Sequence, residues 1–391
     1  MKKVAIISRA LQMNGATKAL VEMLKRIDYS MIEIDLWVLD FSELAEEWVS
    51  QIPDKVVIKK IPRYDIGVIS EGGVKYPIHF VKAVIAGYKL RREEMMIKQW
   101  KYTAQRLPVI DKKYDIAISF RHFDIDIFFT QKNIKADRKY FWVHGIQKMT
   151  PEEVKIIGSY YKKYNGIFPV SISASNNIQQ LFPDLKEKCK VAYCVVDSAE
   201  IVKKSKYGKD FPNKIIEKDT IILFTIGRLG TEKGIDIAIE AAKLLKERKI
   251  KFKWYVAGEG NQRKSLEKMI EEYNLKNEFF LLGNVNNPYR MLKECQIYVQ
   301  PSRLESYGLA VNEAKIFRKV IICSDIPAGR EQIISGKTGI LVELSGEKFA
   351  NAIEKLIRDK EMRENLENGL KKDWSHFEAV EIFKKIVDDK I

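Results

Sequence analysis

The sequence predicts an α/β protein made of two Rossmann-like domains, and three observations support this fold class. Short apolar segments rich in β-branched residues alternate with segments of helical period, as in parallel sheets covered by helices. A polar, charged stretch with glycine and proline at 195–220 interrupts the alternation and is expected to be a linker, and an apolar strand at 221–227 restarts it. The length of 391 residues suits two domains of ordinary size. We therefore expect domains at 1–200 and 201–373, followed by an amphipathic helix in 374–391.

The composition limits the classes of binding partner and the cellular compartment that we expect. The net charge of +15 is spread over both halves and would suit phosphorylated substrates, an anionic membrane surface or nucleic acid. Four cysteines without C-x-x-C spacing are expected to be small buried side chains in a reduced cytosol. The apolar run at the N-terminus is broken by Ser8 and Arg9, too early for a signal peptide, and no run approaches the roughly 18 residues of a spanning helix. The expected location is therefore cytoplasmic, in solution or on a membrane surface.

The first domain begins with a strand, a glycine loop and a helix, the order that opens a Rossmann-like domain. The strand is expected at 4–9 and the loop at Asn14-Gly15-Ala16. His144 follows a later strand directly, at the carboxyl edge where open α/β sheets bind ligands, although a histidine that only packs would suit the same place. The remaining strands of this domain are expected at 32–39, 56–59, 114–120, 140–143, 168–172 and 191–196.

Residues 75–113 are strongly basic, with ten Lys and Arg against three Asp and Glu. Aromatic and methionine side chains are interleaved, among them Trp100, Tyr102 and Met96. Basic residues beside such side chains favour an element that docks on an anionic membrane surface. A pair of solvated helices that pack on the core fits the same pattern nearly as well.

The second domain carries two cations after its first strand. In G-R-L-G-T-E-K-G, Arg228 and Lys233 follow the strand at 221–227 and precede a helix. Such a pair would stabilise the negative charge of a diphosphate leaving group. A later strand ends in a Gly258-Glu-Gly260 turn, and further strands are expected at 280–285, 296–302, 320–325 and 336–343.

The motif at 300–317, QPSRLESYGLAVNEAKIF, joins a buried strand to a helix that is expected to begin at Gly308. In the turn between them, the backbone N–H groups of 306–308 can face an anion at the positive end of the helix. Glu305 and Glu313 bracket this turn with seven residues between them, which places them about 80° apart around a helix. Because carboxylates accept hydrogen bonds from vicinal diols, a phosphate site beside them indicates a nucleotide sugar.

The pattern P-S-x-x-E-S-Y-G-L-x-x-x-E-A in this motif resembles the E-x7-E signature of family-4 retaining glycosyltransferases of the GT-B type. The spacing of Arg228 and Lys233 and the run from Ser324 to Glu331 are similar to that family as well. The resemblance is dense over 221–343 and loose over 1–200. It implies two Rossmann-like domains that face each other across a cleft, with the acceptor in the first domain and the donor in the second. The last helix would cross back to the first domain.

The resemblance also implies the reaction and the roles of residues. A hexose would be transferred from a nucleoside diphosphate sugar, preferably a UDP-sugar, with retention and without a metal or other cofactor. The acceptor would be a glycan or a lipid-linked molecule, as in cell-surface polysaccharide synthesis, and no nucleic acid would take part. Arg228 and Lys233 would hold the diphosphate and Glu313 the ribose, while Glu305 and His144 would contact the sugar. The other donor-site residues implied are Gly15, Gly258, Ser306, Tyr307, Gly308 and Leu309.

Two other functions stay open from the sequence. One is a non-catalytic, sugar-nucleotide-binding partner subunit of a glycosyltransferase, against which the intact motif residues argue. The other is a GT-B sugar-nucleotide epimerase, which would turn over donor without an acceptor. Assays of donor hydrolysis with and without an acceptor separate all three functions.

Asp124 and Asp126 form a D-x-D, the metal motif of the other glycosyltransferase architecture. This D-x-D follows a strand, where an aspartate is expected as the N-cap or in the first turn of a helix. No further cluster of carboxylates or histidines accompanies it in the sequence. We therefore expect no metal site.

Overall fold

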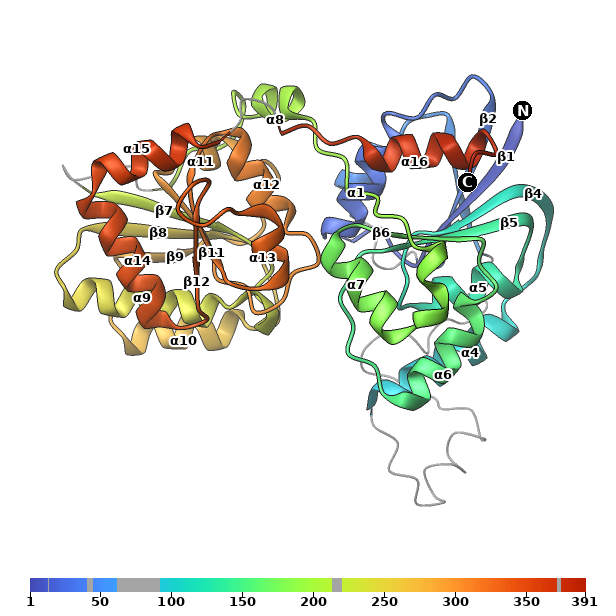
Figure 1. Cartoon of the computed structure of the whole chain (residues 1–391), viewed down its shortest axis with the longest axis horizontal. Helices are drawn as coiled ribbons and strands as arrows, with labels where there is room; N and C mark the ends of the chain where they lie inside the picture. Colours follow the sequence, from blue (N-terminus) through green and yellow to red (C-terminus); the bar gives the residue numbers. More distant parts are fainter. Residues whose placement is uncertain (13, 41–44, 62–91, 213–219, 371–373) are drawn as a thin grey trace, which may run out of the picture. The chain divides into compact units, whose positions relative to one another are not determined.

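The computed structural model describes residues 1–12, 14–40, 45–61, 92–212, 220–370 and 374–391, with the backbone alone at 92–96. Contacts divide these residues into two compact units (Figure 1). The first unit is Met1–Tyr193 together with Glu378–Ile391, and the second unit is Cys194–Phe377. The sequence had placed the corresponding boundaries at 200 and 373.

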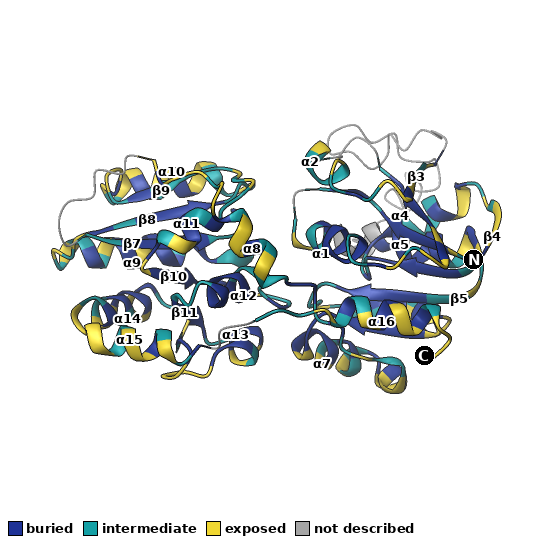
Figure 2. Cartoon of the chain, turned by 90° about the horizontal axis from the view of Figure 1, so that it is seen from above, coloured by how far each residue is buried: buried dark blue, intermediate teal, exposed yellow. Residues whose placement is uncertain are grey.

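The first unit is built on a parallel six-stranded sheet in the order β3-β2-β1-β4-β5-β6. The central strands are buried almost throughout their carboxyl halves because helices cover the sheet, as Figure 2 shows. The order reverses between β1 and β4, so the carboxyl ends of these two strands form the switch point at which open α/β sheets bind ligands. The strands are β1 (Lys2–Ser8), β2 (Ile32–Val38), β3 (Val56–Lys60), β4 (Ile110–Ser119), β5 (Ile134–Val143) and β6 (Gly166–Pro169).

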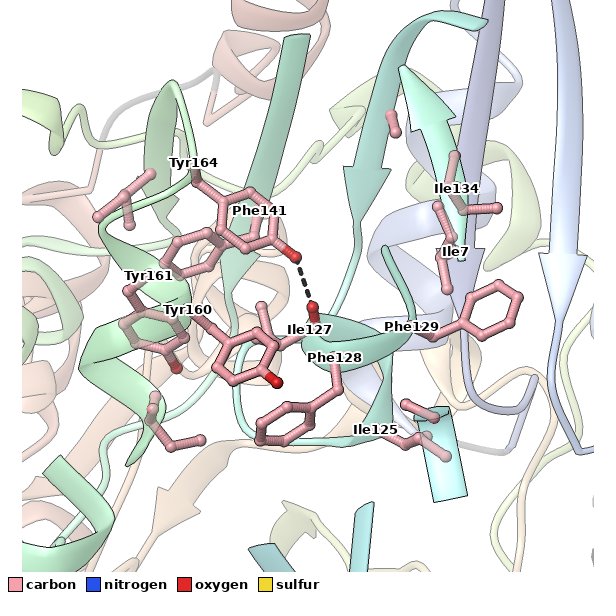
Figure 3. Close-up of a cluster of buried hydrophobic side chains, with 14 of the residues drawn as sticks. Ile7, Ile125, Ile127, Phe128, Phe129, Ile134, Phe141, Tyr160, Tyr161 and Tyr164 are labelled. Atoms are coloured by element: carbon pink, nitrogen blue, oxygen red, sulfur yellow. Dashed lines mark hydrogen bonds between the residues drawn. The ribbon is translucent and has the colours of Figure 1, made fainter. Parts of the chain in front are cut away.

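Aromatic side chains fill the core on one face of this sheet (Figure 3). The rings of Phe128 and Tyr160 lie 4.6 Å apart between centroids, and those of Phe141 and Tyr161 lie 4.4 Å apart. The buried hydroxyl of Tyr164 donates a 3.0 Å hydrogen bond to a backbone carbonyl, which removes the cost of burying it unpaired. The helices of this unit are α1 (Gly15–Leu24), α2 (Glu46–Val49), α4 (Arg92–Arg106), α5 (Ile125–Lys132), α6 (Pro151–Tyr161), α7 (Ile172–Leu181), the 3₁₀ helix η1 (Pro183–Lys188) and α16 (Glu378–Val387).

The last helix, α16, belongs to the first unit, which confirms the predicted return of the chain. Its apolar face, which includes Phe383 and Ile386, is buried. Beyond the helix, Asp389 forms an ion pair with Lys2 at 2.5 Å, and a second one with Arg138. The two ends of the chain are therefore fixed to the same sheet.

Two expectations near the boundary between the units are wrong. No strand forms at 191–196, because only Lys190 and Ala192 donate backbone hydrogen bonds to β6 before the chain leaves the sheet edge. The expected linker at 195–220 contains helix α8 (Ser198–Lys204), which the side chain of Asp197 caps by accepting from the Glu200 N–H at 2.9 Å. Residues 213–219 of that stretch lie outside the described residues.

The second unit is built on another parallel six-stranded sheet, in the order β12-β11-β10-β7-β8-β9. The order reverses between β10 and β7, which places a second switch point there. Its strands are β7 (Ile221–Ile226), β8 (Phe252–Ala257), β9 (Phe279–Leu281), β10 (Ile297–Gln300), β11 (Val320–Ser324) and β12 (Ile340–Val342). Its other helices are η2 (Thr231–Lys233), α9 (Ile235–Glu247), α10 (Arg263–Glu272), α11 (Tyr289–Glu294), α12 (Leu309–Ile316), α13 (Pro327–Gln332), α14 (Gly346–Arg358) and α15 (Lys360–Asn368).

The basic stretch at 75–113 is only partly described, because 75–91 lie outside the described residues. Three of the cations whose side chains are described have carboxylate partners within the first unit. Lys112 pairs with Asp35 at 2.8 Å, and Lys113 pairs with Asp137 at 2.7 Å. Lys98 lies 3.9 Å from Glu152. Docking on a membrane surface therefore stays a prediction.

Within the described part of the chain, no helix is both long enough and apolar enough to span a membrane. Three of the four cysteines are buried, and Cys189 is half-buried. Burial raises the pKa of the Cys323 thiol to about 12, so this side chain stays protonated and packs as an apolar group.

Candidate functional site

The second unit brings its two sequence motifs together at the switch point of its sheet. β7 and β10 are neighbours with Leu223 opposite Ile297, and parallel strands end at the same edge of a sheet. The loops that follow them, 227–234 and 301–308, therefore meet. Gly234 marks the contact: it has φ +65°, and a Cβ on it would lie 2.0 Å from the carbonyl oxygen of Pro301. Only glycine allows this approach.

Lys233 and Glu305 form an ion pair across the two loops, with 2.6 Å between Nζ and Oε1. The same carboxylate oxygen accepts hydrogen bonds from Ser302 at 2.9 Å and from Gln300 at 3.2 Å. Only 22% of the Lys233 side chain and 12% of the Glu305 side chain are exposed. The sequence had assigned the two residues to different parts of a donor, and it gave no signal of their direct contact. Because the pair is largely buried, removing either partner leaves a charge without its counter-ion.

Arg228 has its own carboxylate partner within the same loop. Its Nη2 and Nε donate to Glu232 Oε1 at 2.6 and 3.1 Å. Burial alone would raise the pKa of Glu232, but hydrogen bonds from its own backbone and from Arg228, together with the charge of Arg228, lower it overall. The Arg228 side chain is 69% exposed, so a ligand can reach it. The sequence analysis missed Glu232, although its place four residues after Arg228 in the same loop was a usable signal.

Hydrogen bonds from Gln332, a residue that the sequence analysis also missed, hold the turn before α12. Gln332, at the end of α13, is 8% exposed, and its Nε2 donates to the carbonyl oxygens of Tyr307 and, at 3.1 Å, Gly308. The Tyr307 hydroxyl accepts from Asn312 at 3.0 Å. Helix α12 begins at Leu309, one residue later than expected, because Gly308 adopts a left-handed conformation (φ +80°). No side chain caps the helix N-terminus, which leaves its positive end suited to an anion.

A pocket opens beside this turn. Glu305, Tyr307 and Gly308 line it, together with residues from the ends of β10 and β11 and from α13: Gln300, Ser302, Ser324, Ile326, Gly329 and Gln332. Glu313 is not among the lining residues. It is 3% exposed in α12, and its Oε1 accepts a 3.3 Å hydrogen bond from Tyr289. Glu305 thus lines the pocket and Glu313 lies buried, and the expectation that both face one ligand stays a prediction.

Gly258 belongs to the same edge of the sheet. It directly follows β8, and a Cβ on it would lie 1.9 Å from the carbonyl oxygen of Gly227. The backbone of the Arg228 loop therefore packs on Gly258. This contact positions the loop, and it explains the glycine without a ligand.

The predicted site residues of the first unit lie at the carboxyl edge of its own sheet. His144 follows β5, and its ring lies 4.7 Å from that of Phe120 between centroids. Burial, followed by the charges of His122 and Arg121, lowers the pKa of His144 to about 3, so the ring is neutral at physiological pH. Gly15 is the first residue of α1, whose N-cap Asn14 accepts from the Thr17 N–H at 3.0 Å.

Asp124 and Asp126, the D-x-D residues, occupy the N-terminus of helix α5. Asp124 is the N-cap of α5 and accepts from the Ile125 N–H at 2.8 Å, as expected. Asp126 is fully buried in the first turn, where burial and then the charge of Asp124 raise its pKa well above the ordinary value. Among the described residues, no group of three or more His, Cys, Asp or Glu side chains is placed to hold a metal ion.

Comparisons with known proteins identify similar glycosyltransferases. Residues 207–373 match the family model described as glycosyl transferases group 1. The chain is 26% identical over 268 residues to an uncharacterized glycosyltransferase of Methanocaldococcus jannaschii, covering 59% of this chain and 66% of that protein. It is 28% identical over 229 residues to N-acetylgalactosamine-N,N'-diacetylbacillosaminyl-diphospho-undecaprenol 4-alpha-N-acetylgalactosaminyltransferase of Campylobacter jejuni. This match covers 58% of this chain and 60% of that protein. The chain thus spans less than two thirds of the length of these curated relatives.

The fold is shared over the full length with solved structures. The crystal structure of Anabaena HepE in complex with UDP and glucose superposes with a TM-score of 0.72 at 15% identity, covering 100% of this chain and 99% of that one. The chain therefore has the GT-B fold, and most of its second unit matches the group 1 glycosyl transferase family.

Proposed function

We propose that this protein is a glycosyltransferase that transfers a hexose from a UDP-sugar, with retention, to a glycan or lipid-linked acceptor. One observation carries the proposal. At the switch point of the second sheet, Lys233 pairs with Glu305, which precedes the uncapped N-terminus of α12, and Arg228 lies exposed in the same loop as Lys233. Two cations and a helix N-terminus suit a diphosphate, and a carboxylate beside them suits a sugar hydroxyl. The match of 207–373 to group 1 glycosyl transferases supports the same conclusion.

The reaction would need the leaving diphosphate to be stabilised as the glycosidic bond breaks. Lys233 and Arg228 supply positive charge where the diphosphate gains negative charge, and preorganised groups of this kind are worth several kcal/mol of barrier. Glu305 would bind a sugar hydroxyl. Glu313 would bind the ribose diol after a rearrangement that brings its carboxylate to the surface of α12.

Retention without a covalent intermediate is part of the proposal. Glu305 is occupied by Lys233, Ser302 and Gln300, and Glu313 is buried against Tyr289. Carboxylates engaged in this way are poorly placed as nucleophiles for double displacement. These contacts support a front-face mechanism, in which the acceptor attacks from the side on which the diphosphate leaves. No metal is proposed, because the two cations would supply the electrostatic stabilisation.

The first unit would bind the acceptor, with His144 as a neutral hydrogen-bonding group for the transferred sugar. The relative from Campylobacter is named for a glycan on diphospho-undecaprenol, which supports a glycan or lipid-linked acceptor here. We place the protein in the cytoplasm, docked on the inner face of the plasma membrane by residues 75–113. Sedimentation with anionic vesicles at low and high salt tests the docking, and the absence of binding at low salt would refute it.

The central experiment measures release of UDP from UDP-sugars with and without acceptors. A thermal-shift screen of nucleotide sugars first identifies the donor, and acceptor-dependent release with an α-linked product from an α-linked donor supports the proposal. Turnover of donor to an epimeric sugar nucleotide without acceptor would show an epimerase. Binding without any turnover would show a non-catalytic partner subunit.

A further inference from the structure

The switch point of the first sheet carries two arginines that the proposed donor chemistry does not use. Arg9 directly follows β1 and Arg121 lies just after β4, so the two residues come from the pair of strands where the order of the sheet reverses. Open α/β sheets bind their ligands at this place. The two side chains are mostly buried, with 23% and 19% exposed.

Both guanidinium groups are poorly satisfied by the protein. Each lies 3.7 Å from a different carboxylate oxygen of Asp124, beyond the usual length of a hydrogen bond. Arg121 donates one 3.3 Å hydrogen bond to the carbonyl oxygen of Ala10. In the described part of the chain, the guanidinium of Arg9 donates no hydrogen bond, and its Nε is buried without a partner. Buried donors in this condition are costly unless something else accepts from them.

The charges around the pair leave a net positive site. Asp124 offsets one of the two arginines, and its Oδ1 already accepts from the Ile125 N–H as the N-cap of α5. Burial and then the charge of Asp124 raise the pKa of Asp126 well above its ordinary value, which favours the neutral form of this carboxyl. His122, 5% exposed, has a buried Nε2 that no described residue contacts by a hydrogen bond, and it is a further neutral polar group here.

We propose that Arg9 and Arg121 bind a phosphoryl group of the acceptor. The planar fork of arginine matches phosphate oxygens in a bidentate geometry, and two forks from adjacent strands can grip one phosphoryl group. This proposal rests on the proposed function, and it narrows the acceptor to molecules that carry a phosphate or a diphosphate. The donor has its own cations, Arg228 and Lys233, in the second unit.

The test uses the full-length protein saturated with UDP, so that the donor site is occupied. Inorganic pyrophosphate is then titrated by calorimetry into wild type and into the double variant Arg9→Gln/Arg121→Gln. We expect pyrophosphate to bind wild type and the double variant to bind it at least tenfold more weakly. The matched control, Lys135→Gln/Lys162→Gln, removes two exposed charges of the same unit and should change the dissociation constant less than twofold.

Further arms separate the alternatives. The double variant Arg9→Lys/Arg121→Lys keeps both charges but loses the planar guanidinium groups, so it should bind pyrophosphate with intermediate affinity. It also replaces the glutamine variant as the test if that variant fails to fold. Equal loss in the surface control, or unchanged binding in both arginine variants, overturns the proposal. If the glutamine variant lowers the affinity for UDP by the same factor, the arginines bind the donor, and the proposal that they bind the acceptor is wrong. Failure of wild type to bind UDP at all would instead refute the proposed function.

Discussion

The two units differ in how closely the cations at their switch points are paired with carboxylates. In the second unit, each cation of the site has a close carboxylate partner: Arg228 lies 2.6 Å from Glu232, and Lys233 lies 2.6 Å from Glu305. In the first unit, Arg9 approaches its nearest carboxylate only to 3.7 Å. Both clusters lie at the switch point of a doubly wound sheet, so the architecture is the same and the side chains make the difference.

If both proposals hold, the difference describes how each site would receive an anion. The second unit holds its cations in defined positions with internal counter-ions, and a diphosphate that binds there has to compete with these carboxylates. In the first unit, the two guanidinium groups lie 3.7 Å from Asp124 and Arg121 donates one 3.3 Å hydrogen bond to Ala10, so an anion bound there would displace few existing hydrogen bonds. Preorganisation lowers the cost of reaching the transition state, whereas unsatisfied donors favour binding.

The largest expected effect comes from Lys233→Ala in the second unit. Loss of a cation that stabilises the leaving diphosphate should lower kcat/KM by about 100- to 1,000-fold. The fold should persist, as circular dichroism would show, and Lys243→Ala, which removes an exposed lysine of α9, should act like wild type. A Lys233→Ala value within threefold of wild type would remove the diphosphate role from this residue.

A smaller effect is expected at Gln332, whose side chain donates two hydrogen bonds to the turn before α12; we call these bonds the Gln332 clamp. Gln332→Leu leaves the carbonyl oxygens of Tyr307 and Gly308 without a buried donor, which costs about 1–3 kcal/mol and lets the turn move. We expect UDP affinity to fall roughly tenfold by calorimetry, about 1.4 kcal/mol. Thr338→Val, which removes another buried hydrogen bond of the same unit, should lower stability but leave UDP affinity unchanged. Equal affinity in both variants would mean that the clamp only stabilises the fold.

Lys315 gives a pH-dependent prediction for stability. This side chain of α12 is 3% exposed, lies 4.4 Å from the ring centroid of Trp374, and burial lowers its pKa from 10.5 to about 8. Between about pH 8 and 10.5 the unfolded chain binds more protons here than the folded chain does, so this group makes the free energy of unfolding rise with pH.

The comparison with Lys315→Met isolates this effect, because all other titrating groups are common to both proteins. The stability of wild type relative to the variant should rise by about 1–3 kcal/mol between pH 8 and pH 10.5. Denaturant titrations at several pH values measure it. A flat difference across this range would show that the lysine reaches solvent when folded.

The smallest expected effect is that of a chelator. If the cations of the second unit are sufficient, transfer should continue unchanged in EDTA. Complete loss that Mg²⁺ or Mn²⁺ restores would show that a divalent ion supplies charge that Arg228 and Lys233 do not. It would also require a new search for carboxylate ligands, with Asp124 and Asp126 as the first candidates.

Much of the second unit could be predicted from the sequence. Its strands are short apolar runs, and its site residues stand in two compact motifs at fixed distances from strand ends, so local pattern suffices to locate Arg228, Lys233 and Glu305. The pairing of Lys233 with Glu305, 72 residues apart in the sequence, could not be predicted, because it depends on β10 lying beside β7. The error at 191–196 has a similar origin, since an apolar run becomes a strand only where a neighbour offers a full ladder.

The sequence by itself determined the α/β class, the two-domain division and the donor motifs, since hydrophobic period and motif spacing are local properties of a chain. Tertiary structure decided which charges meet. Arg9 and Arg121 are separated by more than a hundred residues and belong to no motif, yet the reversal of strand order brings both to Asp124. Likewise, Gln332 reaches the α12 turn only because α13 packs beneath it. Such contacts depend on strand order and helix packing, which the spacing of residues along the chain does not encode.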